Sequence, residues 1–507
     1  MRSSRIDAKR RNVSAMRAAT LAPAAWFLVD MLRRLLLITA LAALFSQLVH
    51  ADAPAAQPPS SVLRAMQRHG VPSSSVSIFV RDVAARQTLV ELHPEQPRSP
   101  ASTIKVLTTF AALDMLGPGY TWKTRAFANG ELRKGVLEGD LVLVGGGDPY
   151  MTTERWWTFV RNLRARGVEH ITGDVVLDNT FFAPDETDRG AFDGQIFRSY
   201  NVLPDALMVN FQTTRFTILA APLEERPQIV LFPQPENLKV QNRLRLGPGE
   251  CRGYNRGVSF HMPDPQDPDT VAVSGVFPAS CGSYSISRAV GSAPSYAYGT
   301  FRSLWSEAGG RIDGRMRLNA ADGKLRMLYE HESLLLPEII RLVNKHSNNV
   351  MARHLLLTLG AERYGAPGTI ENGRTAVRAW LAERNIPMPG FVLDNGSGLS
   401  RTERVTARGM GELLDAAWRS PFMPEFAASL PLSAVDGTLR ERFDGPGMQG
   451  RIRLKTGRID DVSGLAGYIH ASSGATYVVV ILINHPGAHL GVGEAIQSEL
   501  VKWVFAK

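Results

Sequence analysis

The spacing of apolar residues changes along the chain, and each change marks a different kind of structure. Apolar and polar side chains alternate over residues 75–81, which predicts a β-strand, and residues 87–92 have the pattern of its hairpin partner. After Pro100 the apolar residues recur at helical spacing as far as Leu116, and Gly117-Pro118-Gly119 follows. Proline near the start of a helix and glycine just beyond its end are the usual asymmetry, so we expect a helix here.

Between residues 121 and 319 the helical spacing gives way to short apolar runs separated by proline and glycine. One helical piece, near residues 156–167, interrupts this pattern. We therefore expect a β-rich insertion of about 200 residues, with a first domain at 121–204 and 291–319 and a second at 205–290. The strands expected within it are 140–144, 174–177, 228–232 and 270–277.

Helical spacing returns after the insertion, and a series of strands follows it. The two ends of the chain, 61–120 and 320–507, therefore form one mixed α/β domain that the insertion splits. The elements expected in its second half are helical segments at 334–359 and 369–384, strands at 451–457, 464–470 and 476–484, and an amphipathic helix at 492–505 that packs on the sheet.

Composition excludes several classes of protein. Of the 507 residues, 44% are hydrophobic and 21% are charged, as in soluble globular proteins, so the chain as a whole is neither disordered nor fibrous. The formal net charge is +9, but residues 1–51 contribute +6 of it. The remaining 456 residues are nearly neutral, which argues against a nucleic-acid-binding protein.

Residues 31–51 have the pattern of a secretory signal peptide. Met31-Leu32-Arg33-Arg34 is short and positive, Leu35 to Leu48 is apolar, and Val49-His50-Ala51 places small residues before a cleavage point at Asp52. The apolar run is shorter than the ~20 residues that a membrane span needs, although an uncleaved N-terminal anchor is the alternative. We expect an upstream extension at 1–30, a linker at 52–60, and export to the periplasm or cell envelope.

The chain has two cysteines, Cys251 and Cys281. In an exported protein a lone pair of this kind favours a disulfide, and two free buried thiols are the alternative. Neither cysteine has the spacing or neighbours of a zinc site, and no metal is expected.

Ser102-Thr103-Ile104-Lys105 is an S-x-x-K motif at the start of the first predicted helix. Residues three apart on a helix share a face, so the lysine amine would lie beside the serine hydroxyl. A serine becomes a good nucleophile when a neighbouring base takes its proton, and a lysine can be that base if burial or another cation lowers its pKa. Such tetrapeptides are common by chance, so the motif decides little alone.

Two further motifs strengthen the signal. Lys455-Thr456-Gly457 ends a predicted strand, where the glycine would let a ligand approach the strand edge and the Thr and Lys could bind a carboxylate. An S-x-N motif occurs twice, as Ser199-Tyr200-Asn201 and as Ser347-Asn348-Asn349. We prefer the second, because it joins two helical segments in the same domain as the other motifs.

The order and placement of the three motifs resemble those of the penicillin-recognising serine enzymes, the group of β-lactamases and penicillin-binding proteins. The long interval between Ser102 and Ser347 is similar to that of D-alanyl-D-alanine carboxypeptidase/endopeptidases of the penicillin-binding protein 4 type, the low-molecular-mass class C. Residues 143–149, 394–401 and 436–439 also resemble that family, although Asn348 stands where its motif often has Asp.

The resemblance covers about 61–507 and implies a fold and a mechanism. The fold is a transpeptidase-like body, an antiparallel sheet with helices on both faces, split by the β-rich insertion. The reaction is acyl transfer on peptidoglycan stem peptides ending in D-Ala-D-Ala, and β-lactams would react covalently with the nucleophile. The implied catalytic roles are Ser102 as nucleophile, Lys105 as base, and Ser347 as a proton relay that Lys455 tunes. The main-chain N–H groups of Ser102 and Arg458 would form the oxyanion hole. The implied substrate-binding residues are Asn349, Lys455, Thr456 and Gly457.

This resemblance requires no cofactor and leaves peripheral membrane association open. A β-lactamase is one alternative, because it shares the fold and differs in how fast it releases the acyl group. A non-catalytic envelope protein that binds peptidoglycan or a partner is the other. The glycines at 145–147 are not followed by the Lys and Ser/Thr of a phosphate-binding loop, so we interpret them as a turn between strands.

Overall fold

The computed structural model describes residues 57–507, except Glu186, residues 221–225 and Tyr254. The predicted extension and signal peptide, and the first part of the predicted linker, therefore lie outside the described residues. Within the described ranges, no helix is both long and apolar enough to cross a bilayer.

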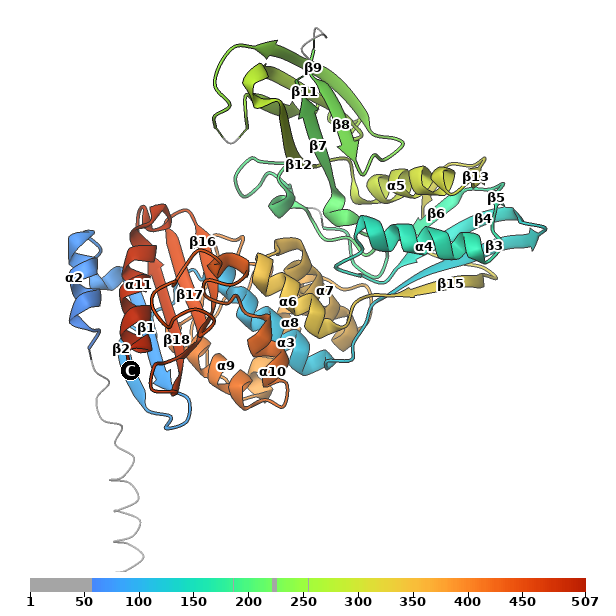
Figure 1. The fold of residues 1–507 in the computed structure, drawn as a ribbon. Coiled ribbons are helices and arrows are strands. Elements are labelled where there is room, and N and C mark those ends of the chain that lie inside the picture. Colours follow the sequence, from blue (N-terminus) through green and yellow to red (C-terminus); the bar gives the residue numbers. More distant parts are fainter. Residues whose placement is uncertain (1–56, 186, 221–225, 254) are drawn as a thin grey trace, which may run out of the picture. The chain divides into compact units, whose positions relative to one another are not determined.

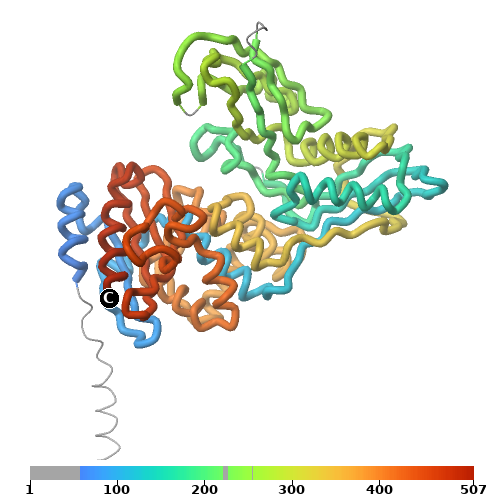
Figure 2. Tube along the Cα trace, in the orientation of Figure 1, coloured from blue at the N-terminus to red at the C-terminus, as the bar shows by residue number. Residues whose placement is uncertain are grey.

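The body of the protein is built on a five-stranded sheet in which every neighbouring pair is antiparallel. The N-terminal hairpin joins strands from the other end of the chain, because β1 pairs with β18 along its whole length (Figure 2). The predicted hairpin and the three predicted C-terminal strands are confirmed. In sheet order, the strands are β16 (Ile452–Ile459), β17 (Val462–His470), β18 (Thr476–Asn484), β1 (Val76–Asp82) and β2 (Thr88–Leu92).

Each face of this sheet is covered by helices, because successive side chains of a strand point to opposite faces. On β18, Val478 and Val480 belong to one apolar core, and Val479 and Ile481 belong to the other. Figure 1 shows α2 and α11 together on one side of the strands. The helices in the second core are α2 (Ser60–Arg68) and α11 (Val492–Phe505); those in the first are α3 (Lys105–Leu116), α6 (Leu336–His346), α7 (Asn349–Tyr364), α8 (Ile370–Glu383), α9 (Ala407–Arg419) and α10 (Met423–Ser429).

The insertion is rich in strands, as predicted. Its largest sheet runs β13-β5-β4-β3-β15, with β6 pairing both β4 and β14, and two three-stranded sheets run β10-β11-β9 and β12-β7-β8. The strands are β3 (Lys123–Arg133), β4 (Val136–Gly145), β5 (His170–Ile171), β6 (Val175–Asp178), β7 (Thr213–Leu219), β8 (Gln228–Phe232), β9 (Lys239–Gly247), β10 (Val258–His261), β11 (Thr270–Pro278), β12 (Ser283–Ala289), β13 (Arg311–Ile312), β14 (Met316–Leu318) and β15 (Arg326–Glu332). A disulfide joins Cys251 and Cys281.

The insertion also contains a helix that the sequence pattern did not predict. The expected helical piece is α4 (Thr153–Ala165), and the unpredicted one is α5 (Ala293–Glu307). The side chain of Ser292 caps α5 by accepting a hydrogen bond from the main-chain N–H of Ser295. Small and aromatic residues make up most of α5, so its buried face lacks the aliphatic spacing by which helices are recognised.

The division of the insertion into two domains stays a prediction. One apolar cluster includes residues of β4, β7, β9 and β11 and of both helices, so it extends across the predicted boundary at residue 205. β15 pairs with β3, and this pairing favours a final boundary after Glu332 rather than at residue 319.

The packing of α11 on the sheet predicts the effect of truncating one of its side chains. Leu500 is fully buried, so Leu500→Ala should lower the free energy of unfolding by about 2–5 kcal/mol. Leu490→Ala, at a leucine that is 76% exposed, is the matched control and should change it by less than about 0.5 kcal/mol. Urea unfolding followed by circular dichroism measures both, and equal effects would contradict the packing.

Candidate active site

Ser102 lies in a short 3₁₀ turn, η2 (Ala101–Ile104), that leads directly into α3. Lys105 is the first residue of α3, and its Nζ donates to the Ser102 Oγ over 3.0 Å. The structure therefore places the two residues of the S-x-x-K motif in contact, as their spacing predicts. The Ser102 hydroxyl is also 3.5 Å from the main-chain oxygen of Ser397.

Glycines on two neighbouring segments allow this turn to be approached closely. A Cβ on Gly457, the glycine of the K-T-G motif, would lie 2.5 Å from the main-chain oxygen of Pro100. A Cβ on Gly398 would lie 2.1 Å from that of Ala101. We expected the K-T-G glycine to make room for a ligand; in the structure it makes room for the turn that carries Ser102.

The amine of Lys105 is fully buried and is surrounded by neutral acceptors. Besides Ser102 it donates to Asn349 Oδ1, over 2.7 Å, and to the main-chain oxygen of Ser397. Burial, and then the positive charge of Lys455, lower the pKa of Lys105 well below its ordinary range, while the Glu403 carboxylate acts in the opposite direction. A neutral amine beside a hydroxyl is the arrangement that a general base requires.

The K-T-G and S-x-N motifs meet through a second buried lysine. Lys455 Nζ donates to Ser347 Oγ over 2.9 Å and to the main-chain oxygen of Thr456 over 2.8 Å. Burial lowers the pKa of Lys455 to about 7. Ser347 itself ends α6 in the left-handed conformation, with φ 55°, so the chain reverses there and presents the hydroxyl to the lysine.

The other two residues of this S-x-N motif have separate contacts. Asn348 caps α7 by accepting a hydrogen bond from the main-chain N–H of Met351. An aspartate can make the same contact, so having Asn rather than Asp at this position leaves the helix capped. Asn349 accepts from Lys105, and its Nδ2 donates to the main-chain oxygen of Tyr200 over 3.2 Å. Tyr200 lies in η3 (Ser199–Asn201), so the second S-x-N motif contributes a main-chain oxygen rather than its side chains.

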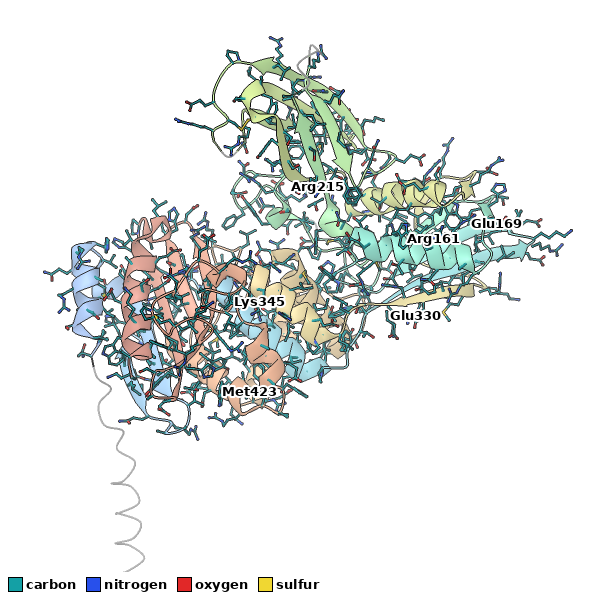
Figure 3. The ribbon with its side chains drawn as sticks, viewed as in Figure 1. Arg161, Glu169, Arg215, Glu330, Lys345 and Met423 are labelled. Atoms are coloured by element: carbon teal, nitrogen blue, oxygen red, sulfur yellow. A yellow bond between two sulfur atoms is a disulfide. The ribbon has the colours of Figure 1, made fainter. Side chains whose placement is uncertain are left out.

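The stretch at 436–439 positions the edge of the K-T-G strand. Lys345, labelled in Figure 3, forms an ion pair with Asp436 over 2.8 Å and so holds this stretch against the end of α6. Thr438, in η6 (Gly437–Leu439), lies 2.9 Å from Thr456 between their Oγ1 atoms. The hydroxyl of Thr456, the residue after Lys455, therefore contacts the hydroxyl of Thr438.

The loop at 394–401 contains the contact that sequence reasoning missed. Its contribution to the site is the Ser397 main-chain oxygen, which receives the Lys105 amine. Asn395 Oδ1 accepts from both the N–H and the hydroxyl of Ser397, which fixes that oxygen in place. The only signal in the sequence was the run of small polar residues Asp394-Asn395-Gly396-Ser397-Gly398, from which no role could be derived.

The carboxylate of Glu403 fixes the main chain of this loop by hydrogen bonds. One oxygen of its buried carboxylate accepts from the main-chain N–H groups of three successive residues, Asp394 to Gly396, over 2.9–3.3 Å. Its other oxygen, Oε2, is buried and has no hydrogen-bond partner. Burial raises the pKa of Glu403 to about 7.

The glycine loop at 145–147 is a tightly packed turn, although it lies between β4 and α4 rather than between strands. A Cβ on Gly145 would lie 2.3 Å from the main-chain oxygen of Ala206, and the Gly147 oxygen is 3.2 Å from His354 Nδ1. These contacts connect the loop to α7.

Comparison with known proteins agrees with this geometry. The D-Ala-D-Ala carboxypeptidase 3 (S13) family matches the chain over residues 61–507. The chain belongs to this family. A D-alanyl-D-alanine carboxypeptidase of Actinomadura sp. (strain R39) is 29% identical to the chain over 446 residues, 84% of this chain and 81% of that protein. A D-alanyl-D-alanine carboxypeptidase of Haemophilus influenzae is 24% identical over 416 residues, 81% and 85% of the two chains.

Two solved structures show that the fold is also shared. Penicillin-binding protein 4 from Haemophilus influenzae has a TM-score of 0.76 at 22% identity, covering 88% of this chain and 99% of that one. A predatory endopeptidase from Bdellovibrio bacteriovorus, in complex with an immunity protein, has a TM-score of 0.51 at 17% identity, covering 85% and 93%. The transpeptidase-like fold expected from the motifs is confirmed.

Within this S13-family site, the oxyanion hole stays a prediction. Arg458 follows the K-T-G motif on β16, paired with Ser463 of β17. Its side chain is two-thirds exposed and lies 3.9 Å from Glu494.

The buried carboxylate of Glu403 predicts a pH dependence of stability. Because its pKa is raised from 4.5 to about 7 by folding, the unfolded chain loses this proton first, and the free energy of unfolding falls as the pH rises between these values. The contribution is roughly 3 kcal/mol. Glu403→Gln keeps an oxygen that accepts from the loop, and its side chain does not titrate. Between pH 5 and pH 8, the free energy of unfolding of this variant should therefore fall by roughly 3 kcal/mol less than that of the wild type.

Urea unfolding at the two pH values tests this expectation. Glu307→Gln, at an exposed carboxylate, is the control and should reproduce the wild-type dependence. If Glu403→Gln lost as much stability with rising pH as the wild type, the assignment of the raised pKa would be wrong.

Proposed function

We propose that this chain is a serine D-Ala-D-Ala carboxypeptidase that also cleaves peptidoglycan cross-links, through an acyl-enzyme on Ser102. The observation that carries the proposal is the contact between Ser102 Oγ and the buried amine of Lys105, whose pKa is lowered by burial. Membership of the D-Ala-D-Ala carboxypeptidase 3 (S13) family supports the substrate, a peptide ending in D-Ala-D-Ala. One relative in structure is named an endopeptidase, which supports cross-links as a second substrate.

Acylation begins when Lys105 takes the hydroxyl proton of Ser102. The Ser102 oxygen then bonds to the carbonyl carbon of the penultimate D-Ala, and the main-chain N–H groups of Ser102 and Arg458 stabilise the resulting oxyanion. The bond to the leaving nitrogen breaks, and that nitrogen takes a proton relayed from Lys105 through Ser347. The hydrogen bond from Lys455 to Ser347 supports this relay, because it orients the hydroxyl.

The residues next to Lys105 and Lys455 bind the substrate. Asn349, held by Lys105 and by the main chain of Tyr200, binds a substrate amide. Thr456, beside Thr438 and the Lys455 amine, binds the terminal carboxylate, for which the neighbouring positive charge is suited. Water then attacks the acyl carbon and releases Ser102 with its proton restored.

The proposal extends to β-lactams and to location. A penicillin-binding protein 4 structure contains a β-lactam, and that protein shares this fold at a TM-score of 0.70 and 22% identity. We propose that β-lactams react covalently with Ser102 of this chain. Export to the periplasm rests on residues 31–51, which lie outside the described residues.

Intact-protein mass spectrometry with benzylpenicillin tests the nucleophile. The wild type and Ser73→Ala, at an exposed serine of the same domain, should each gain one lasting adduct, and Ser102→Ala should gain none.

Lys105→Met should slow acylation by roughly a thousandfold or more. The double variant that also carries Ser102→Ala should hydrolyse the peptide only slightly more slowly than either single variant, because the two residues act as a unit. The acylation rate should fall as the pH falls below the lowered pKa of Lys105, because the protonated amine cannot act as a base.

Two outcomes would contradict the proposal. Full labelling of Ser102→Ala would exclude this serine as the nucleophile. An adduct that disappears within seconds, with matching release of penicilloate, would indicate a β-lactamase instead.

A further inference from the structure

A large cavity lies within the insertion, away from the three motifs. Its volume is about 850 Å³, within the range of small-molecule sites, and it is lined by parts of residues 187–203, by β10 and the residues around it, and by residues 288–291. We call it the Arg189 cavity. None of the motif residues lines it.

The lining of the Arg189 cavity combines positive charge with apolar surface. Among the described residues, Arg189, Arg198 and Arg288 line it together with one carboxylate, that of Asp188. Its apolar wall includes the side chains of Phe197, Phe260 and Met262. An amphipathic anion would complement such a surface, because the arginines bind its charge while the wall covers its apolar part.

Arg189, which lines this cavity, has side-chain donors that are not used in hydrogen bonds. Its Nη1 donates to the main-chain oxygen of Gly291 over 3.3 Å, while Nε and Nη2 are buried and have no hydrogen-bond partner among the residues that the structure describes. Buried donors without partners cost free energy, so such a pair of groups needs an explanation, and a bound ligand is one. Nε and Nη2 form one edge of the guanidinium, and that edge can pair with both oxygens of a carboxylate.

The segment 187–203 separates the Arg189 cavity from the active-site loop. On its other side, a smaller cavity of about 190 Å³ is lined by Arg353, Asp394 and Arg401, and Arg189 lines both cavities. The same segment contains Tyr200, whose main-chain oxygen receives Asn349. A ligand in the Arg189 cavity would therefore contact the segment that supports Asn349.

We propose that the Arg189 cavity is a second binding site for an acidic peptide, the carboxylate-bearing stem peptide of peptidoglycan, apart from the reacting bond. This inference rests on the proposed function, which supplies the polymer. A stem peptide carries several carboxylates for the arginines and alkyl groups for the apolar wall. A chain held here and cut elsewhere would stay bound to the enzyme between cleavages.

Isothermal titration calorimetry with an N-acetylmuramyl tripeptide tests the site. The probe, muramyl-L-Ala-γ-D-Glu-meso-diaminopimelate, lacks D-Ala-D-Ala and so cannot be cleaved. The wild type should bind it, and the same peptide with amidated carboxylates should bind at least tenfold more weakly. Arg189→Gln should weaken binding about tenfold or more, since it removes a charged pair of donors.

Two variants locate the peptide. Ser259→Trp, at an exposed position in the cavity lining, should block binding by filling the space. Arg215→Gln, at an exposed arginine of β7 labelled in Figure 3, removes the same charge outside the cavity and should bind like the wild type. Circular dichroism and thermal unfolding establish that each variant is folded.

The outcomes separate this inference from the proposed function. No binding by the wild type, or equal binding by Ser259→Trp, would overturn the second site. Loss of binding in Arg401→Gln with full binding in Ser259→Trp would place the peptide in the smaller cavity and also overturn it. Benzylpenicillin labelling of the wild type and of Arg215→Gln tests the proposed function independently, since the tripeptide titration does not depend on acylation.

Discussion

Two buried lysine amines act on each other electrostatically in this protein, and neither has a carboxylate as hydrogen-bond partner among the described residues. The hydrogen-bond acceptors that the structure gives Lys105 and Lys455 are two serine hydroxyls, one amide oxygen and two main-chain oxygens. A carboxylate at this distance would stabilise the ammonium forms and keep both amines protonated. Neutral oxygens satisfy the N–H groups while leaving burial free to lower both pKa values.

This constraint explains why several side chains around the site serve to fix main-chain oxygens. The Ser397 oxygen belongs to a loop whose main-chain N–H groups donate to the side chains of Asn395 and Glu403. Ser347 projects from a left-handed residue at the end of α6, and Asn349 from the first turn of α7. Each of these arrangements places a neutral oxygen next to a lysine amine. The two apolar cores, one on each face of the sheet, supply the stability that the buried polar groups do not.

The sequence predicted the elements whose apolar spacing is regular. Residues 476–484 and 492–505 form a strand and a helix with the predicted bounds, because their buried faces are mostly aliphatic. The three motifs were found because their side chains carry the chemistry. The pattern could not reveal α5, whose buried face is aromatic and small, nor the Ser397 oxygen, since a main-chain group leaves no trace in residue type. Glu403 was missed for a related reason: a buried glutamate is identified by its depth, which spacing alone does not give.

The pairing of β1 with β18 has a consequence for the order in which the protein is made. Val76 pairs with Ile483, so the central strands of the body come from opposite ends of the chain. The sheet cannot be completed until nearly all of the chain has been synthesised, and closing so long a loop is slow. The insertion has its own sheets and its own apolar core, so its strands can pair earlier. Ser102 and Lys455 can therefore meet only after most of the chain has been made.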